Sequence, residues 1–369
     1  MEKRVINICD VCEEIFAGGD APKDRFSETK TDDFSVPIYS NGEANSGLYG
    51  YTNFSRVNVP SITVSARGTI GYTTIRHEPF VPIVRLITLV PKTDVIDINY
   101  LYYATQNYKF VNNGTSIPQL TVPMLKRYSF PLPSMEQQKK IADEFDKVTV
   151  LIDKRKKQLE KLDELVKARF VELFGDINAN DREWNVQSLG ELCTIVRGGS
   201  PRPIEKYLGG DIPWIKIGDA TDGESIYLHS TKEHIVQAGV SKSRMVKSGS
   251  LIFANCGVSL GFARIITFDG CIHDGWLAME DIDERLNKVF LLQSLNQMTE
   301  HFRRIAPAGT QPNLNTAIMK AYKQIVPPLE LQKEFIAFVE QVDKSKFEIK
   351  QSLEKLESLK KALMQKYFG

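Results

Sequence analysis

The feature that most constrains this chain is the uninterrupted stretch from Ser134 to Gly175. Counting forwards from Phe145 in alternating steps of three and four residues gives nine positions, of which seven are apolar. That spacing is typical of a coiled-coil seam. No Gly or Pro lies between Pro133 and Gly175, so we predict one helix of about forty residues, roughly 60 Å long. A helix this long with so narrow an apolar stripe is not an ordinary core helix.

The end of the chain repeats this stretch. Residues 330–369 superimpose on residues 136–175 at one constant offset without a gap. The motif Leu-Glu-Lys-Leu, for example, occurs at residues 159–162 and again at residues 353–356. Prolines precede both copies, which suits a strand that ends where a helix begins. The repeat therefore predicts the order domain, helix, domain, helix.

The apolar stripes of the two helices complement each other. Basic residues interrupt each stripe where the other one is apolar, and the equivalent positions are Arg155 with Ile349, Arg169 with Leu363, Lys346 with Ile152, and Lys360 with Val166. Four basic residues would be poorly placed between identical helices, so we predict that the two helices pair within one chain. The alternative is that each is a long amphipathic helix lying on its own domain. The predicted seam consists of Phe145, Val148, Ile152, Leu159, Leu162, Val166, Val339, Val342, Ile349, Leu353, Leu356 and Leu363.

The segments that precede the two helices read as mixed, β-rich domains. Their short β-branched and aromatic runs are broken by Gly, Asn, Asp and Pro, a pattern typical of strands and turns. We therefore expect an α+β protein with domains at residues 1–133 and 177–327 and long helices at residues 134–176 and 328–369.

Weaker sequence echoes, in the same order in both halves, indicate that the two domains are copies of each other. The echoing segments are residues 16–22 with 196–201, 36–38 with 212–215, 65–71 with 254–261, and 114–120 with 309–314. The frame is retained while the loops diverge. This favours two recognition domains that share one fold and bind different targets over two divergent domains without a recognition role.

Charge composition gives no support for nucleic-acid binding. The 369 residues include 47 Lys and Arg against 46 Asp and Glu, and the balance is near neutral along the whole chain. A DNA-binding surface would therefore need a local arrangement of positive charge, or a partner that supplies it.

The cysteines and the N-terminus bear on the cellular compartment. Five cysteines are irregularly spaced, and Cys9 with Cys12 forms a single C-x-x-C pair, which without a second pair favours small buried thiols over zinc or redox chemistry. The N-terminus lacks the apolar core of a signal peptide, and no apolar run reaches membrane-spanning length. We expect a soluble cytoplasmic protein.

The sequence contains no recognisable catalytic motif. Phosphate loops, dinucleotide fingerprints, amino-methyltransferase motifs and nucleophile elbows are all absent from it. The pair His273 and Asp274 lies close to Cys271, but this spacing does not match known zinc sites. We therefore predict no catalytic residue, no metal site and no enzymatic activity in this chain alone.

The loops of both domains are rich in side chains suited to DNA. Arg and Lys can bind guanine or phosphate, and Asn and Gln can make paired hydrogen bonds to adenine. Taken alone, each of these residues fits an ordinary solvated loop residue better than a DNA contact. The candidates are Arg56, Arg67, Thr69, Lys109, Asn112, Asn113, Thr115, Ser116 and Gln119 in the first domain, and Arg197, Ser200, Arg202, Lys216, Asn255, Ser259, Arg264, Gln311 and Asn313 in the second.

Taken together, these features resemble the specificity (S) subunit of Type I restriction-modification systems over the full length of the chain. The resemblance rests on the proline-led opening at residues 131–141, the helix ending in Phe-Gly at Gly175, and the second copy ending at Gly369. Trp184 and residues 212–217 resemble the openings of that family's target recognition domains.

The resemblance implies an architecture and a function. The helices would pair as an antiparallel coiled coil with pseudo-twofold symmetry, and each target recognition domain would read one half of a bipartite double-stranded DNA sequence. The helices would set the gap between the halves and dock two modification (M) subunits, which bind S-adenosylmethionine and methylate adenine. Restriction (R) subunits would join for cleavage. This chain itself would carry no cofactor and contact no membrane.

There are two alternative functions, of which the sequence disfavours the second. A coiled-coil adaptor could use its two domains to bind proteins or glycans. A self-contained methyltransferase would need motifs that the sequence lacks. In one respect the chain departs from the family pattern, because its first half starts without the Trp-containing lead found at Trp184. We expect either a slightly trimmed first domain or one that is closed by the end of the distal helix.

Overall fold

The computed structural model describes residues 4–109, 118–221, 226–257, 259–307 and 312–369. The chain divides into two compact units. Unit 1 comprises Met1–Lys156 and Lys350–Gly369, and unit 2 comprises Lys157–Ile349. Each unit therefore holds one globular segment together with one end of each long helix. The predicted domain limits at residues 133, 176 and 327 stay a prediction.

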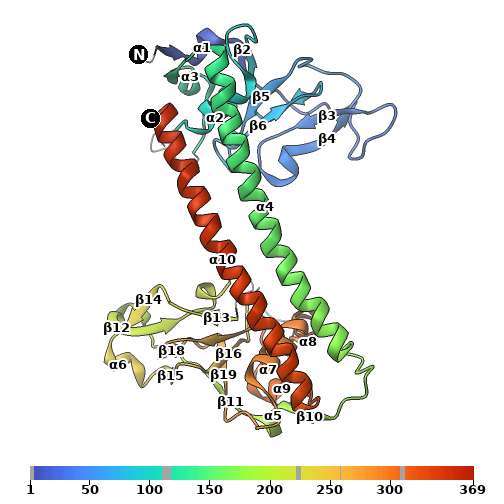
Figure 1. Cartoon of the computed structure of the whole chain (residues 1–369), viewed down its shortest axis with the longest axis vertical. Helices are drawn as coiled ribbons and strands as arrows, with labels where there is room; N and C mark the ends of the chain where they lie inside the picture. The colour runs from blue at the N-terminus through green and yellow to red at the C-terminus, as the bar shows by residue number, and fades with distance from the viewer. Residues whose placement is uncertain (1–3, 110–117, 222–225, 258, 308–311) are drawn as a thin grey trace. The chain divides into compact units, whose positions relative to one another are not determined.

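Unit 1 combines short strands and helices with the start of α4 and the end of α10 (Figure 1). Its strands are β1 (Val5–Asn7), β2 (Cys12–Ala17), β3 (Val36–Tyr39), β4 (Leu48–Thr52), β5 (Ser61–Val64), β6 (Thr73–Arg76), β7 (Val81–Pro82), β8 (Ile87–Pro91) and β9 (Ser129–Pro131). Its helices are α1 (Ile8–Val11), the 3-10 helix η1 (Ala44–Gly47), α2 (Ile98–Gln106), α3 (Val122–Leu125), and parts of α4 (Met135–Phe174) and α10 (Leu329–Phe368).

The strands of unit 1 form two main sheets. One sheet has the order β2-β8-β5-β6 and the other β4-β3-β7, while β1 pairs with β9. Neighbours are antiparallel except β3 and β7, which run parallel. Strand β8 is buried at every position, as expected for an apolar run between two neighbours. Asp97 directly precedes helix α2, and its carboxylate caps the helix by accepting from the N–H of Tyr100 at 3.0 Å.

Unit 2 contains the same kinds of element. Its strands are β10 (Val186–Ser188), β11 (Thr194–Arg197), β12 (Leu208–Ile215), β13 (Tyr227–Leu228), β14 (Glu233–Ile235), β15 (Arg244–Val246), β16 (Leu251–Ala254), β17 (Ala263–Ile266), β18 (Gly270–Ile272), β19 (Trp276–Glu280) and β20 (Lys323–Ile325). Its helices are α5 (Leu189–Leu192), η2 (Ile204–Lys206), η3 (Ile217–Asp219), α6 (Gln237–Val240), α7 (Lys288–Gln297), α8 (Thr299–Ile305), α9 (Thr316–Ala321), and the remaining parts of α4 and α10.

The strand order of unit 2 repeats that of unit 1. Its larger sheet runs β11-β19-β16-β17-β13 and its second sheet β14-β12-β18-β15, with β10 pairing with β20. The first four strands match β2-β8-β5-β6 in order, and the parallel pair β12 and β18 matches β3 and β7. Unit 2 adds β13 and β15 at the sheet edges. The predicted duplication of the domains is confirmed.

Backbone hydrogen bonds show which single residues of the two units are equivalent. The N–H of Leu120 donates to the carbonyl of Ala66 at 2.9 Å, and the N–H of Leu314 donates to the carbonyl of Asn255 at 2.7 Å. Gly71 and Gly261 close the equivalent turns, and both have a positive φ, 86° and 98° respectively, which glycine adopts without strain. The echoes at residues 65–71 and 254–261 therefore correspond to equivalent turns.

The two predicted long helices are present, and α4 and α10 are each 40 residues long. In unit 1 the ring of Phe145 on α4 stacks 5.9 Å from Phe368 near the end of α10. In unit 2 the ring of Phe170 lies 5.4 Å from Phe335 near the start of α10. Opposite ends of the helices thus meet in each unit, which confirms an antiparallel pair within one chain.

All of the predicted seam side chains are buried or half-buried. The apolar stripe nevertheless departs from the heptad count after Val166. Phe170 is fully buried, whereas Arg169, the next position in the count, is half-exposed. An α-helix has 3.6 residues per turn rather than 3.5, so its apolar face drifts. The ring of Phe290 on α7 then widens that face, because it stacks 5.8 Å from Phe170.

Three of the basic residues in the two stripes, Arg169, Lys346 and Lys360, have acidic or aromatic neighbours. In unit 2, Arg169 donates to Glu334 at 2.6 Å, and Lys346 pairs with Asp163. In unit 1, the ammonium of Lys360 lies 6.0 Å from the centre of the Tyr103 ring, and burial lowers its pKa. These contacts explain how positive charges are accommodated in a partly buried interface.

A buried glutamine at the start of each long helix fixes that helix to its globular segment. The amide oxygen of Gln138 accepts from the N–H of Asp97 at 2.8 Å, and that of Gln332 accepts from the N–H of Asn287 at 2.8 Å. Each amide nitrogen donates to two backbone carbonyls, those of Val95 and Pro133 for the first glutamine and those of Arg285 and Pro327 for the second. Every polar group of both amides is thereby satisfied.

The distal helix end is part of the unit 1 core. Phe368 packs 5.1 Å from the ring of Tyr100, and its carbonyl accepts from the side chain of Asn107 at 3.1 Å. In unit 2 the carbonyl of Phe174 accepts from the indole of Trp184 at 2.9 Å instead. These contacts support the expectation that the distal helix end closes the first domain.

All five cysteines are free. Burial raises the pKa of the Cys12 thiol to about 12, which makes a thiolate at neutral pH unfavourable. Within the described ranges, no group of three or more His, Cys, Asp or Glu could hold a metal ion. Among the helices in the described part of the chain, none is both long and apolar enough to cross a membrane.

Candidate nucleic-acid interface

In unit 1, loops from four parts of the sequence are joined by hydrogen bonds. Asn41 accepts from the N–H of Ala66 at 2.7 Å and donates to the carbonyl of Val84 at 2.6 Å. The N–H of Gly42 donates to the hydroxyl of Ser65 at 3.1 Å. These bonds join the loop after β3, the turn after β5 and the loop between β7 and β8. Leu120 adds the fourth segment through its backbone bond to Ala66.

The turn after β5 carries the best-defined candidate of unit 1. Arg67 donates from Nε and Nη2 to the amide oxygen of Gln119, at 3.2 and 2.9 Å. Arg67 is exposed and Gln119 is half-exposed. The structure therefore brings together two of the residues predicted to contact DNA.

The loop between β7 and β8 is strained. Val84 and Arg85 have φ values of 51° and 64°, a region that residues with a Cβ, and β-branched ones above all, rarely adopt. Hydrogen bonds from their N–H groups to Gly19 at 2.7 Å and Gly18 at 3.0 Å hold this conformation. Arg85 is exposed as a result.

The remaining candidates of unit 1 are spread over its loops. Arg56 is exposed and lies with its guanidinium 4.3 Å above the ring of Phe16. Thr69 is exposed in the same turn as Arg67, and Lys109 is exposed after α2. The other four predicted residues, Asn112, Asn113, Thr115 and Ser116, lie outside the described residues.

In unit 2 the loop between β18 and β19 gathers charged side chains around Asp274. Its carboxylate accepts from the hydroxyl of Ser200 at 2.7 Å and from Nε2 of His273 at 2.9 Å. Arg202 lies 3.9 Å from the second carboxylate oxygen. The Nε of Arg197 donates to the backbone carbonyl of Asp274 at 2.9 Å. The structure thus brings three predicted residues together around Asp274, two at its carboxylate and one at its backbone carbonyl.

Burial lowers the pKa of His273, and the positive charges of Lys216, Arg202 and Arg197 lower it further, while Asp274 acts in the opposite direction. The N–H of Gly275 donates to Nδ1 of this histidine at 2.9 Å. Nδ1 is therefore the acceptor nitrogen, and Nε2 carries the proton that is donated to Asp274.

The other candidates of unit 2 are held within its framework. Lys216 pairs with Glu233. Asn255 is fully buried and donates to the side chain of Asn313 at 3.1 Å and to the carbonyl of Leu314 at 3.3 Å. Its side chain therefore positions the neighbouring segment. Gln311, also predicted to contact DNA, lies outside the described residues.

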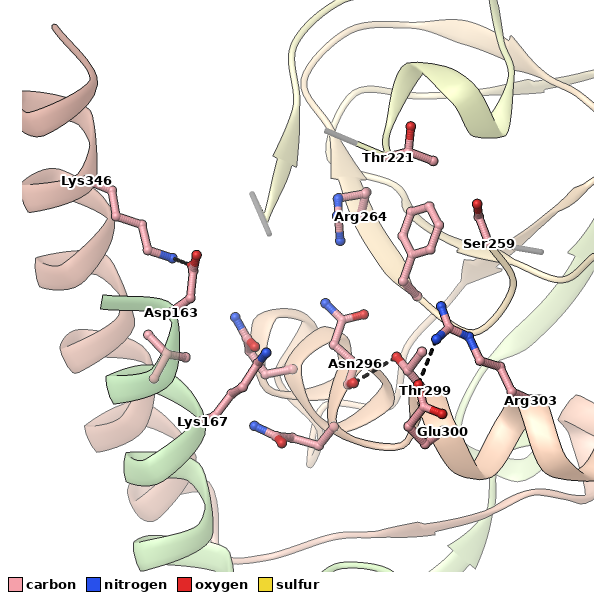
Figure 2. Close-up of a pocket in the computed structure, with 14 residues that line it drawn as sticks. Asp163, Lys167, Thr221, Ser259, Arg264, Asn296, Thr299, Glu300, Arg303 and Lys346 are labelled. Carbon is pink, nitrogen blue, oxygen red and sulfur yellow. Dashed lines mark hydrogen bonds and ion pairs between the residues drawn. The ribbon is translucent and has the colours of Figure 1, made fainter. Parts of the chain in front are cut away.

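Figure 2 shows a polar pocket of about 490 Å³ in unit 2. Asp163 and Lys346 form its helical side, and Ser259 and Arg264 line it from the turn before β17 and from that strand. Arg264 is only 6% exposed, donates to the carbonyl of Ala263 at 2.8 Å and lies against the Phe262 ring.

Several residues at these loops were not singled out by the sequence as DNA-contacting. Asn41 occurs in an ordinary Ser-Asn-Gly turn, and Arg85 follows an apolar run, so neither stands out until the fold brings the loops together. In the sequence, His273 and Asp274 stand out only as a candidate metal cluster with Cys271. Cys271 instead lies in the buried strand β18 and belongs to a core cluster with Trp214.

Comparisons with known proteins cover most of the chain. The family model of the Type I restriction modification DNA specificity domain matches residues 2–164 and 181–361. S.MpnORF89P of Mycoplasma pneumoniae, named as a type I specificity subunit, is 35% identical over 170 residues, covering 43% of this chain and 50% of that protein. The specificity subunit of the Type I restriction enzyme MjaIX from Methanocaldococcus jannaschii is 23% identical over 334 residues, covering 83% of this chain and 76% of that protein.

Solved structures show the same fold. The crystal structure of a Type I restriction-modification S subunit from M. genitalium has a TM-score of 0.59 at 18% identity, covering 99% of this chain and 96% of that one. A chain from a structure on the assembly and conformational transition of the type I system has a TM-score of 0.59 at 16% identity, covering 99% and 97%. Two of the matches to relatives from M. pneumoniae cover 50% and 39% of the length of those relatives.

Proposed function

This chain belongs to the family of Type I restriction-modification DNA specificity domains, and on that premise we propose that it is the DNA-recognition and scaffold subunit of a Type I complex. The recognition domains at residues 1–133 and 177–327 each read one half of a bipartite DNA sequence. The paired helices set the unread spacer between the two half-sequences. The chain itself carries no catalytic residue and no cofactor.

One observation carries the proposal. The two units share a strand order but differ in the side chains that their equivalent loops present. The loop between β7 and β8 begins Ile83-Val84-Arg85, and the equivalent residues of unit 2 are His273-Asp274-Gly275. A duplicated frame with different loop chemistry is what two readers of different half-sequences need. Catalytic duplicates would instead be expected to retain one constellation of side chains.

The long helices support docking of two copies of one partner. Leu165 on α4 and Leu359 on α10 occupy equivalent positions in the repeat, and each is 47% exposed. Exposed leucines on helices that already pair offer apolar area to a further helix. Since this equivalent pair places one such leucine in each unit, the fitting partner is a pair of identical modification subunits. These bind S-adenosylmethionine, methylate adenine and supply phosphate contacts that a near-neutral chain lacks, and restriction subunits join them for cleavage.

The test is footprinting of the complex with its cognate modification subunits. We expect protection of two short half-sequences separated by an unread spacer. Absence of bipartite, sequence-selective protection would contradict the proposal and favour an adaptor that binds proteins or glycans.

An insertion sharpens the test of the spacer. Seven residues added after Leu159 and seven after the equivalent Leu353 keep the heptad phase and lengthen both helices by about 10 Å. We expect a spacer longer by roughly three base pairs, at about 3.4 Å per pair, with both half-sequences unchanged. The same seven residues added after Gly369 serve as the control, with no change in spacing. Altered half-sequences in the helix variant would contradict the ruler role.

A further inference from the structure

Arg67 stands on a rigid turn of unit 1. Hydrogen bonds from the N–H of Ser65 to the carbonyl of Tyr72, at 2.8 Å, and from the N–H of Gly71 to the carbonyl of Ser65, at 2.9 Å, close the turn between β5 and β6. The N–H of Ala66, next to Arg67, donates to Asn41. The backbone that carries Arg67 is therefore fixed on both sides.

The side chain of Arg67 is fixed as well. Its Nε and Nη2 both donate to one oxygen of Gln119, and Gln119 is held in turn because the adjacent Leu120 donates to the carbonyl of Ala66 at 2.9 Å. A guanidinium that is already ordered loses less rotamer freedom when it binds.

The contact with Gln119 leaves one edge of the guanidinium available. Nε and one hydrogen of Nη2 face the glutamine, so Nη1 and the second hydrogen of Nη2 form a pair of parallel donors. Among the residues that the structure describes, no other hydrogen-bond or ion-pair partner of Arg67 is found. Two parallel donors match O6 and N7 of guanine in the major groove.

The equivalent place in unit 2 has a different chemistry. Asn255 corresponds to Ala66 through the repeated backbone bond, so Cys256 corresponds to Arg67, and Asn313 corresponds to Gln119. Asn313 accepts a hydrogen bond from the side chain of the buried Asn255. The residue equivalent to Arg67 is Cys256, which has an uncharged thiol. At this turn, only unit 1 has a guanidinium that is hydrogen-bonded to a side-chain amide.

We propose that Arg67 is a specificity-determining residue that reads a guanine in the half-sequence of unit 1, and that Gln119 is its positioning residue. The inference rests on the proposed DNA-reading function. It goes further in naming the base, the residue and the half-site.

The test uses the full chain in complex with its modification subunits and a panel of duplexes. Each base pair of both half-sequences is changed in turn, and the equilibrium binding constant is measured at one fixed salt concentration. For the unaltered complex we expect one guanine in a single half-sequence whose replacement weakens binding roughly 5- to 150-fold. Arg67→Ala removes that preference and leaves every other position, and the spacer, unchanged.

Companion variants separate base reading from charge and from folding. Arg67→Lys keeps the charge and retains part of the preference, because an ammonium is a point donor. Gln119→Ala weakens the preference in the presence of Arg67 and has no further effect in the Arg67→Ala background, whereas Gln119→Glu retains it. Arg127→Ala, an exposed arginine after α3, is the matched control and changes nothing.

Two results would overturn the inference while leaving the proposed function intact. If Arg67→Ala weakens binding equally for every duplex, the residue contacts phosphate rather than a base. If it changes neither affinity nor preference, the residue does not contact DNA. A complex in which unaltered protein shows no bipartite preference at all would instead overturn the proposed function.

Discussion

The two units of this chain have the same frame and different loops. The sheets β2-β8-β5-β6 and β11-β19-β16-β17 follow the same order, and the backbone bonds at Ala66 and Asn255 are equivalent. The side chains at those places differ, since Gln119 accepts from Arg67 in unit 1, whereas the equivalent Asn313 of unit 2 accepts from Asn255. Main-chain hydrogen bonds and apolar packing therefore maintain the fold that the two units share, and the side chains of the loops can differ without disturbing it.

The strongest test of the shared frame removes the aromatic rings where the long helices meet. Phe145 in unit 1 and Phe335 in unit 2 are both fully buried, so truncation leaves a cavity as well as lost contacts. We expect Phe145→Ala and Phe335→Ala each to lower the free energy of unfolding by about 3–5 kcal/mol. Phe347→Ala, at a site 61% exposed on α10, is the control and should change it little.

Urea unfolding followed by two probes separates the units in this experiment. The three tryptophans of the chain, Trp184, Trp214 and Trp276, all lie in unit 2, so their fluorescence reports on that unit, while circular dichroism reports on both. Phe335→Ala should shift both transitions. Phe145→Ala should shift the dichroism transition, and its effect on fluorescence measures how far the units unfold together. A loss below about 1 kcal/mol for either variant would show that its cluster does not anchor the frame.

A smaller loss is expected from the buried glutamines that start the two long helices. Replacing Gln138 or Gln332 by alanine leaves the N–H of Asp97 or Asn287 and two carbonyls without a partner, which costs about 1–3 kcal/mol. The three bonds of Gln332 range from 2.8 to 2.9 Å, whereas one bond of Gln138 is 3.3 Å long. We therefore expect the larger loss in unit 2.

The exposed Gln137 provides the control for this pair. Its replacement by alanine, one residue away on the same helix, should leave the urea midpoint within experimental error of the parent chain. Equal midpoints for Gln138→Ala and the control would mean that the repeated amide is not needed in unit 1. The equivalence of the two helix starts would then fail.

The sequence was sufficient to predict the elements whose pattern is periodic. The heptad stripe after Phe145 and the gapless copy at residues 330–369 gave two helices, their pairing and the duplicated domains. The turns were predictable for a related reason, since Gly71 and Gly261 sit where the backbone needs a positive φ.

The side-chain contacts of the loops could not be predicted in the same way. Arg67 and Gln119 are 52 residues apart, and Asn41 meets Val84 across the ends of separate strands. No periodicity links such residues, because their proximity depends on the order of strands in the sheet. A count of 3.5 residues per turn predicted Arg169 as the seam residue instead of Phe170. That count fails where the surface against which the helix packs is a globular core.

The smallest expected effect concerns pH, and it again distinguishes the units. His273 lies in the loop of unit 2 whose counterpart in unit 1 is Ile83. Burial lowers the pKa of His273 in the folded chain below its ordinary value of 6.5. As the pH falls below about 6.5, the unfolded chain takes up the proton first, so the folded state loses stability until the pH passes the lower, folded pKa.

We therefore expect the urea midpoint of the fluorescence transition to fall between pH 7.5 and pH 5.5, and the fall to be shallower in His273→Gln. The nearby Asp274 limits the effect, because it favours the protonated ring while Lys216, Arg202 and Arg197 oppose it. Asp274→Asn removes the opposing charge and should steepen the fall. If His273→Gln leaves the slope unchanged, the acid sensitivity of unit 2 arises elsewhere, and this loop differs from its unit 1 counterpart in shape and hydrogen bonding alone.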